Sequence, residues 1–411
     1  MTLEATAPVA CGRRSAHVVA DDTEALALAA ALAEEFAVEA GARDAERRLP
    51  GRELDRLSDS GLLGITVPRA FGGADVSART LAEVFRRLAS ADPNLAQIPQ
   101  DHIVDVDVLR QQGSPAQQEF FFGEVLAGKR FGSAQSEAGA THAQDYRTRL
   151  LPGVCGGFLL RGVKQYSTGA LFADWIPVLA RGEDRKLYVA YVPWGTPGLA
   201  VIDDWAGMGQ RTTASGTVRL NDVPVPAGRV VPYHLTFEGP QVHGATAQLL
   251  HAAIDVGIAG GALNEAVEFV RTEARPWVES GVGSGVESAA EDPLVIQRVG
   301  ELAVRVRAAE ALLDAAGRAV DEARAGLTDA SAGAASIAVA TAKAFADPVA
   351  VELGSAVFEL GGTRSSLERL NLNRHWRNAR THTVHDPARW KIQHIGRYVL
   401  SGQLPPRNGV L

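Results

Sequence analysis

The order of three sequence textures constrains the fold of this 411-residue chain more than any single motif. Residues 22–129 are rich in Ala, Leu and Glu, which favours helices. Residues 130–231 contain short apolar runs separated by Gly, Asn and Asp, which is typical of strands joined by tight turns. After Pro240 the helical period returns. We predict an α+β chain with a flexible leader and three domains: leader 1–20, helical domain 21–129, β domain 130–236 and helical bundle 237–411.

Two long helices dominate the predicted bundle. Apolar residues stepping by three or four positions form one stripe along a helix, which packs against a neighbouring helix. A second run, residues 332–360, is rich in small residues, so helices can approach closely there. Within it, Pro348 predicts a helix start or a kink. The Gly/Ser-rich residues 280–288 predict a long loop. The stripe consists of Ile296, Val299, Leu302, Val306, Ala309, Leu313, Ala316 and Val320.

Charge and cysteine content exclude several classes of protein. The net charge of −7 and pI of about 5.8 disfavour nucleic acid or an anionic membrane as a partner. Cys11 and Cys155 are too few and too far apart for a disulfide framework or a zinc cluster, so we expect a cytoplasmic protein. No run reaches the roughly 18 consecutive apolar residues of a membrane helix.

Two segments of the N-terminal region carry a family resemblance. Residues 61–73 (GLLGITVPRAFGG) and 89–96 (ASADPNLA) resemble the N-terminal domain of the acyl-CoA dehydrogenase superfamily. The resemblance extends over residues 22–397. It implies an N-terminal helical domain, a central β-barrel or sandwich and a C-terminal four-helix bundle. It also implies a homotetramer built as a dimer of dimers, for which the small-residue faces of residues 332–360 are suited.

Three segments resemble the parts of that superfamily that line a flavin: residues 131–137 (FGSAQSE), 162–169 (GVKQYSTG) and 173–175 (ADW). The resemblance implies that the hydroxyl of Ser136 meets the pyrimidine side of the flavin and that of Thr168 its N5/O4 edge. A single Ser or Thr at a strand end more often caps a turn. Two at matching positions favour the flavin site. The flavin-lining candidates are Ser133, Gln135, Ser136, Thr168 and Trp175.

The later segments bear on which flavin is bound. Residues 357–362 (VFELGG) resemble the segment whose glycines, here Gly361 and Gly362, approach the FAD pyrophosphate of a neighbouring subunit. The Gln that usually precedes this pair is not present, which favours FMN over FAD. Arg380 is a candidate for the flavin phosphate, because a guanidinium offers two parallel donors.

The expected dehydrogenase base is replaced by histidines. Residues 380–387 (RTHTVHDP) stand where dehydrogenases carry a glutamate, and they resemble the reduced-flavin-dependent monooxygenases of the dibenzothiophene monooxygenase type, most of all the sulfur-acquisition branch. That resemblance implies that His385 lies near the flavin together with Thr168, and that His102 faces the same pocket. His382 is the remaining candidate. A second possible base position falls on Ile254, and Asp255 beside it points about 100° away.

A metal site is the alternative reading of these histidines. His382, His385 and His394 have ligand chemistry, yet no Cys or Glu completes a set and Pro387 interrupts the helix. We therefore predict no metal. Without the resemblance, His102 is more often a surface or capping residue.

The resemblance implies a two-component monooxygenase. It would use FMNH2 and O2 through a C4a-hydroperoxyflavin to oxygenate a small organosulfur compound. A separate NAD(P)H:flavin reductase would supply FMNH2, since no dinucleotide-binding fingerprint follows a strand. Two alternatives stay open: an FAD-dependent acyl-CoA dehydrogenase with an atypical base, and an inactive binding protein that keeps the fold.

Overall fold

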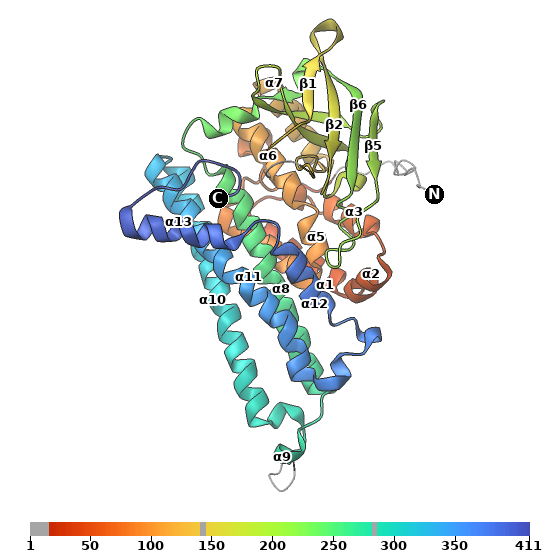
Figure 1. Cartoon of the computed structure of the whole chain (residues 1–411), viewed down its shortest axis with the longest axis vertical. Coiled ribbons are helices and arrows are strands. Elements are labelled where there is room, and N and C mark those ends of the chain that lie inside the picture. The colour runs from red at the N-terminus through yellow and green to blue at the C-terminus, as the bar shows by residue number, and fades with distance from the viewer. Residues whose placement is uncertain (1–15, 140–144, 282–285) are drawn as a thin grey trace.

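The computed structural model describes residues 16–139, 145–281 and 286–411. It confirms the predicted α+β class and the order of helices, sheet and helices (Figure 1). Most of the predicted leader, residues 1–20, and part of the predicted loop, residues 280–288, lie outside the described residues.

The N-terminal helices pack side by side under the sheet (Figure 1). The first begins where predicted, because the Asp21 side chain accepts from the backbone N–H of Glu24 at 3.0 Å. The Ala-rich run ends at residue 37 and a second helix begins at Ala40. The helices are α1 (Asp22–Ala37), α2 (Ala40–Glu46), α3 (Gly51–Asp59), α4 (Ala78–Ala91), α5 (Pro93–Gln97), α6 (Gln100–Gln112) and α7 (Pro115–Leu126).

The central domain is one seven-stranded sheet in the order β5-β6-β2-β1-β3-β4-β7. Neighbouring strands are antiparallel except β1 and β3, which are parallel. Buried side chains of α6 and α7 pack with Trp175, Leu179 and Tyr191 of the sheet. The sheet is thereby fixed on the N-terminal helices. The strands are β1 (Arg149–Pro152), β2 (Phe158–Lys164), β3 (Trp175–Arg181), β4 (Leu187–Pro193), β5 (Leu199–Ile202), β6 (Thr217–Val225) and β7 (Val230–Val231).

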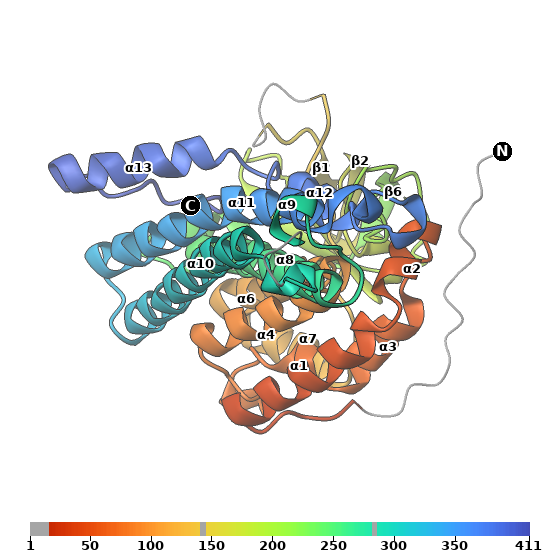
Figure 2. The same ribbon diagram turned by 90° about the horizontal axis from the view of Figure 1, so that it is seen from below.

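The C-terminal region is a bundle of long helices that runs away from the sheet (Figures 1 and 2). Its core continues into α4 and α1, so the two helical regions share one hydrophobic cluster. By length and composition α11 resembles a membrane span, with mean hydropathy 1.3, yet it packs on α8, α10, α12 and α13 as a core helix. The helices are α8 (His243–Thr272), α9 (Val278–Gly281), α10 (Pro293–Ala325), α11 (Asp329–Ser365), α12 (Arg374–His382) and α13 (Ala388–Ser401).

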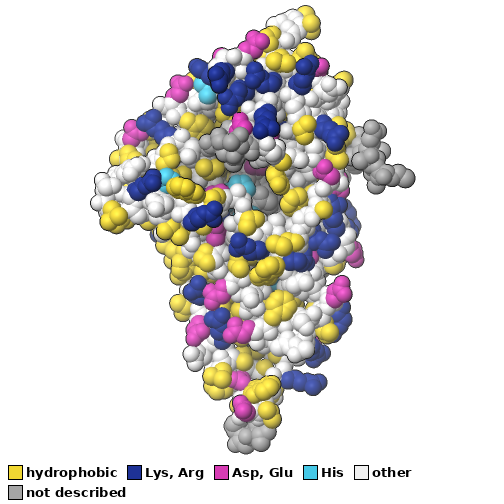
Figure 3. Space-filling model, viewed as in Figure 1, with side chains coloured by type: hydrophobic (Ala, Val, Ile, Leu, Met, Phe, Trp, Pro, Cys, Tyr) yellow, Lys and Arg dark blue, Asp and Glu magenta, His cyan; other side chains and the backbone are white. Residues whose placement is uncertain are grey.

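Two expectations about α11 need correction. The helix neither begins nor leaves helical geometry at Pro348, and its only non-helical residue is Gly362 in the last turn. Its small residues mostly face the bundle core, where they are buried. Exposed apolar side chains lie instead on α10 and on α13, which projects from the bundle (Figures 1 and 3). On α13 they are Trp390, Ile392, Val399 and Leu400.

Candidate active site

The hydroxyl of Thr168 heads a short chain of hydroxyl groups in the β domain. Its Oγ1 lies 2.7 Å from Oγ of Ser215, which lies 2.7 Å from Oγ1 of Thr213. Thr213 in turn donates to the carbonyl oxygen of Gln210 at 2.9 Å. Because a carbonyl only accepts, the protons of the chain all point toward Gln210. Thr168 therefore donates to Ser215, and its oxygen keeps a lone pair for a ligand N–H.

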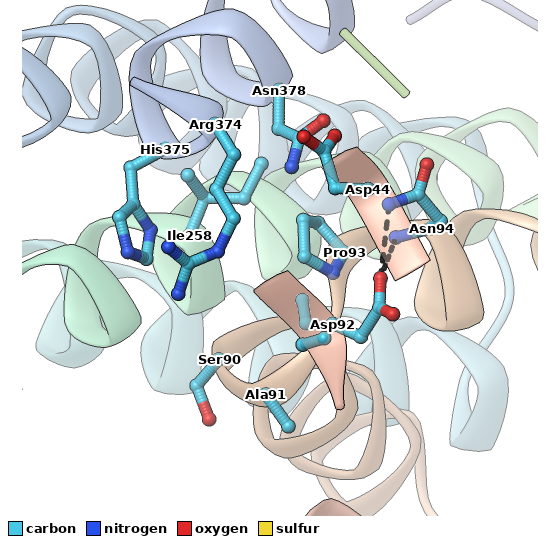
Figure 4. A pocket seen from close by; sticks show the side chains of 12 residues that line it. Asp44, Ser90, Ala91, Asp92, Pro93, Asn94, Ile258, Arg374, His375 and Asn378 are labelled. Atoms are coloured by element: carbon cyan, nitrogen blue, oxygen red, sulfur yellow. Dashed lines mark hydrogen bonds between the residues drawn. The ribbon is translucent and has the colours of Figure 1, made fainter. Parts of the chain in front are cut away.

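The loop that carries these hydroxyls is held between two helices. The Asn378 side chain of α12 accepts from the backbone N–H of Gln210 at 2.7 Å, and the Asn94 side chain of α5 accepts from that of Thr212 at 3.2 Å. Asn94 is itself oriented by Asp92, at 2.9 Å. Figure 4 shows Asn94 and Asn378 among the side chains that line the small cavity between these helices. The two amides fix the loop in place.

Ser133 and Ser136 lie beside the loop that bears Thr168. The backbone N–H of Ser133 donates to the carbonyl of Thr168 at 2.9 Å, and that of Gln165 donates to the carbonyl of Ser136 at 2.9 Å. Ser133 is buried and Ser136 is exposed. The structure therefore brings the predicted residues Ser133, Ser136 and Thr168 together.

A buried lysine holds the segment that includes Gln135. The Lys164 ammonium donates to the Gln135 carbonyl at 2.9 Å and pairs with Glu137 at 2.7 Å. Burial lowers the pKa of Lys164 to about 8, although Glu137 opposes the shift. Lys164 thus fixes the backbone of this segment from inside the β domain.

Trp175 does not lie where the sequence predicted. It is 6% exposed, its indole N–H donates to Glu124 of α7 at 2.9 Å, and its ring packs against Phe121. This places it in the core between sheet and helices, without a free donor. The aromatic side chain next to Thr168 is Tyr166, which is 58% exposed and has a positive φ of 55°. The motif KQYSTG at residues 164–169 indicates this position, since Tyr166 directly precedes the hydroxyl residues Ser167 and Thr168.

His102 is placed for a structural role. The backbone N–H of Phe131 donates to its Nδ1 at 3.0 Å, and its Nε2 donates to the carbonyl of Leu63 at 3.0 Å. Burial lowers its pKa to about 4. Both ring nitrogens are therefore in use, and the geometry argues against the expected catalytic role.

Three histidines and one aspartate meet between α8 and the end of α12. Nδ1 of His382 lies 2.6 Å from Oδ1 of Asp255, and its Nε2 lies 3.2 Å from Nδ1 of His251. The ring of His251 is stacked on that of His385, with centroids 4.1 Å apart and an angle of 31° between planes. His385 is half exposed, whereas the other three side chains are buried. In the space-filling view, a histidine is visible at a hollow between the sheet and the helices (Figure 3).

A buried charge network supports this cluster. The Lys343 ammonium lies 3.2 Å from Asp255, 3.0 Å from Asp347 and 3.7 Å from Asp386, which also pairs with Lys391 at 2.5 Å. Burial alone would raise the pKa of Asp255, but His382 and Lys343 outweigh it and hold the pKa at about 2. Burial and the neighbouring Asp255 raise the pKa of Asp347 to about 8.

The sequence contained a signal for this network. His251 and Asp255 are four residues apart, as are Lys343 and Asp347, so each pair shares a helix face. Neither His251 nor Asp255 had been given a functional role from the sequence.

Asp101 of α6 links the histidines to the β-domain loops. Burial raises the pKa of its carboxyl, and both Ser133 and His385 oppose the shift, so both lie within its electrostatic reach. One turn on, the Asp105 carboxyl is fully buried, and neither oxygen has a hydrogen-bond partner among the residues that the structure describes. Burial and Asp101 raise the pKa of Asp105 well above its ordinary value.

The remaining predicted residues are spread over the bundle. Arg380 is exposed on α12, and its guanidinium has no ion pair within the described ranges. Gly361 packs against Phe269, which follows His251 by 18 residues of α8, about 27 Å along the helix. Gly361 therefore lies far from the histidine cluster within one chain. Within the described ranges, no three His, Cys, Asp or Glu side chains are placed to hold a metal ion.

Family models match almost the whole chain. The N-terminal domain of acyl-CoA dehydrogenase matches residues 22–129, the middle domain residues 131–223, and the C-terminal domain residues 249–390.

Curated relatives and solved structures narrow the likeness. Dibenzothiophene monooxygenase of Rhodococcus erythropolis is 32% identical, over 94% of this chain and 95% of that protein. A probable FMNH2-dependent monooxygenase, SfnC, of Pseudomonas putida is 32% identical, over 93% and 96%. FMN-bound TdsC of Paenibacillus sp. A11-2 superposes with a TM-score of 0.88 at 30% identity, over 94% and 100%. Methanesulfinate monooxygenase MsuC of Pseudomonas fluorescens superposes with 0.85 at 31%, over 94% and 99%.

Proposed function

The chain belongs to the acyl-CoA dehydrogenase family, and on that premise we propose that it is a reduced-FMN-dependent monooxygenase that oxygenates a small organosulfur compound. Its relatives over nearly the full length are named as monooxygenases, and one of them is named as FMNH2-dependent. Among the solved structures that this chain resembles, TdsC contains bound FMN and MsuC is a methanesulfinate monooxygenase.

The residues around Thr168 fit a reduced flavin. The lone pair on Thr168 suits a ligand N–H, and reduced flavin carries such a group at N5 whereas oxidised flavin does not. The exposed ring of Tyr166 offers an aromatic face beside it, and the exposed hydroxyl of Ser136 can serve either a donor or an acceptor. Arg380 supplies a free guanidinium for a phosphate. When bound, the reduced flavin would supply the activation of O2.

FMN fits better than FAD. A larger cofactor needs residues that hold its adenylate half, and the glycine pair Gly361 and Gly362 is expected to meet the cofactor of a neighbouring subunit. Only contact with a second copy of the chain would bring such a segment near, and the missing Gln before these glycines weakens that possibility.

His385 is the proposed proton donor to the reacting oxygen. One face of its ring rests on His251 and its Nδ1 lies 3.6 Å from Oδ1 of Asp386, while 47% of the side chain is exposed and accessible to a ligand. An imidazole can donate or accept a proton near neutral pH. The buried apolar residues of α6 and α8 limit the access of water, which prevents wasteful loss of the activated oxygen as hydrogen peroxide.

Reduced flavin is proposed to come from a separate NAD(P)H:flavin reductase in the cytoplasm. This chain lacks a dinucleotide-binding fingerprint after a strand. The working unit is proposed to be a homotetramer.

The match over nearly the full length to proteins named as monooxygenases carries this proposal, and the lone pair on Thr168 and the half-exposed ring of His385 agree with it. The test is to mix the anaerobic protein with FMNH2, admit O2 and follow the flavin spectrum with a panel of sulfides, sulfoxides, sulfones and sulfinates. We expect one of these compounds to gain an oxygen atom with little peroxide. Tightly bound FAD together with oxidation of an acyl-CoA would instead support a dehydrogenase, and no binding of FMN or FMNH2 would support an inactive scaffold.

A further inference from the structure

We propose that His251, His382 and Asp255 form a proton store beside the oxygenation site, in which a proton taken up by His251 is passed inward to His382. This inference rests on the proposed function. The overall reaction converts FMNH2, O2 and a sulfur compound into FMN, the oxygenated product and water. Hydrogen that leaves the flavin must reach the departing oxygen, so a shielded site needs groups that take up and return a proton.

The hydrogen-bond directions follow from the carboxylate. Lys343, 3.2 Å away, keeps Asp255 ionised, and an ionised carboxylate only accepts. His382 therefore donates from Nδ1 to Asp255 and presents a lone pair at Nε2. That lone pair accepts the Nδ1 proton of His251, 3.2 Å away. His251 is left with its own lone pair at Nε2.

Proton uptake can then proceed without moving a heavy atom. A new N–H bond forms at Nε2 of His251, its Nδ1–H bond breaks, and an N–H bond forms at Nε2 of His382. The positive charge ends on His382, next to the Asp255 carboxylate at 2.6 Å. Reversal of the same three changes returns the proton to the site.

The surroundings favour this inward position of the charge. Burial lowers the pKa of His251 well below its ordinary value, and His385, stacked on it, lowers the pKa further. His382 in contrast contacts a carboxylate. Lys343 does not cancel that carboxylate, because the ionised Asp386 carboxylate also lies 3.7 Å from its ammonium. In this arrangement Asp255 is a positioning residue, and His251 and His382 carry the proton.

A second buried His–Asp pair, between His243 of α8 and Asp107 of α6, provides a matched control. Nδ1 of His243 lies 2.7 Å from Oδ2 of Asp107, and the imidazole is buried against the rings of Tyr233 and Phe237. No second histidine contacts His243 in the described part of the chain. Asp107→Asn and Asp255→Asn thus make the same chemical change at two buried pairs, of which one belongs to the proposed store.

The first measurement needs no flavin. Magic-angle-spinning NMR of the 15N-histidine-labelled full chain reports which ring nitrogen carries the proton. We expect His382 to carry it at Nδ1 in the unmodified protein. In Asp255→Asn the new amide N–H faces that nitrogen, so His382 should switch to Nε2–H and His251 should become the acceptor. Asp107→Asn should leave both unchanged. An unchanged tautomer in Asp255→Asn would overturn the proposed store, whatever reaction the protein catalyses.

The second measurement asks whether the store is used. We expect Asp255→Asn to lower the ratio of oxygenated product to hydrogen peroxide at least about tenfold, a modest part of the range for proton-transfer groups, with FMNH2 affinity within about twofold. His251→Ala should respond to added imidazoles in proportion to their basicity, which a space-filling role would not produce. If His382 switches its tautomer in Asp255→Asn while the ratio of oxygenated product to hydrogen peroxide stays unchanged, the store has no role in oxygenation. A complete lack of product from the unmodified protein would count against the proposed function, and the NMR result would still decide the store.

Discussion

Nδ1 of His382 lies 2.6 Å from Oδ1 of Asp255, and this contact joins the end of α12 to the middle of α8. The segment after α12, which bears His385, turns immediately at Pro387 into α13. A buried charge-assisted bond at the start of that segment fixes where His385 can stand. The position of the proposed proton donor is therefore set by a residue 130 positions earlier in the chain.

His385→Ala is expected to separate oxygen use from product formation. The imidazole is proposed to protonate the reacting oxygen, a contribution of typically 10²–10⁴-fold, whereas oxidation of free reduced flavin needs no protein group. Product should nearly vanish while peroxide accumulates under excess FMNH2. His394→Ala, a partly buried histidine on α13, is the control. If the product-to-peroxide ratio of a folded His385→Ala protein equals that of the unmodified chain, His385 has no part in the reaction.

Thr168→Val and Ser215→Ala are expected to affect flavin binding differently. The first removes the acceptor and should weaken FMNH2 binding by about 1–3 kcal/mol, or roughly 5–150-fold. Ser215→Ala removes the group that accepts the Thr168 proton, so Thr168 can also donate to a ligand. The ratio of the affinity for FMNH2 to the affinity for FMN should therefore fall. Anaerobic fluorescence titration with both redox forms measures each affinity. Equal effects of both variants on the two forms would contradict the assigned hydrogen-bond direction.

Tyr166→Ala and Trp175→Phe test which aromatic ring meets the flavin. Tyr166 is exposed beside Thr168, so its loss should weaken FMN binding at least about fivefold, a stacking contribution of about 1 kcal/mol. Trp175→Phe keeps a ring in the core but leaves Glu124 without its donor, so it should lower the melting temperature and spare FMN affinity. The reverse pattern would restore Trp175 to the flavin site.

Asp347→Asn is expected to change the pH dependence of stability. The folded-state pKa of Asp347, about 8, lies above its ordinary 3.8, so the folded chain holds a proton there that the unfolded chain has lost. This contribution is complete below pH 3.8 and is lost as the pH rises toward 8. As the pH rises from 5 to 8, the melting temperature of Asp347→Asn relative to that of the unmodified chain should therefore increase by at least about 2 °C. A constant difference over this range would mean that Asp347 is already ionised at pH 5.

The double substitution Val399→Glu and Leu400→Glu tests the proposed tetramer. These side chains are 75% and 88% exposed on α13, and apolar residues left uncovered on a projecting helix mark a contact surface. Light scattering should give the mass of four chains for the unmodified protein and a smaller species for the variant. A single-chain mass for the unmodified protein at micromolar concentration would contradict the tetramer.

Local patterns in the sequence predicted the fold and the neighbouring positions of the Ser136 and Thr168 segments well. The α10 stripe depends on neighbours within a few residues, and it is buried as predicted from Leu302 to Val320, whereas Ile296 at its start is exposed. The loop that includes Thr168 and the segment with Ser136 were also correctly brought together, because each contains its own motif. Long-range partners were harder to predict.

The errors share one physical cause, which is contact between distant parts of the chain. His102 offers an ordinary imidazole in the sequence, and only folding places Leu63 and Phe131 at its two nitrogens. Trp175 is drawn into the core by α7, some fifty positions before it. From the sequence, Asp255 is a poor replacement for a base at the position of Ile254, because it points to another side of the helix. In the folded chain its carboxylate contacts His382, a partner that no local pattern could reveal.

The side-chain amides of Asn94 and Asn378 hold the loop between Gln210 and Thr212. These contacts affect how ligands enter and leave the site. They tie α5 of the N-terminal helices and α12 of the bundle to a single turn of backbone in the β domain. Swinging the sheet away from the helices would break both buried bonds at once, a cost that thermal motion rarely meets. Opening of the site by such a movement is therefore disfavoured, and we expect turnover to be little affected by solvent viscosity.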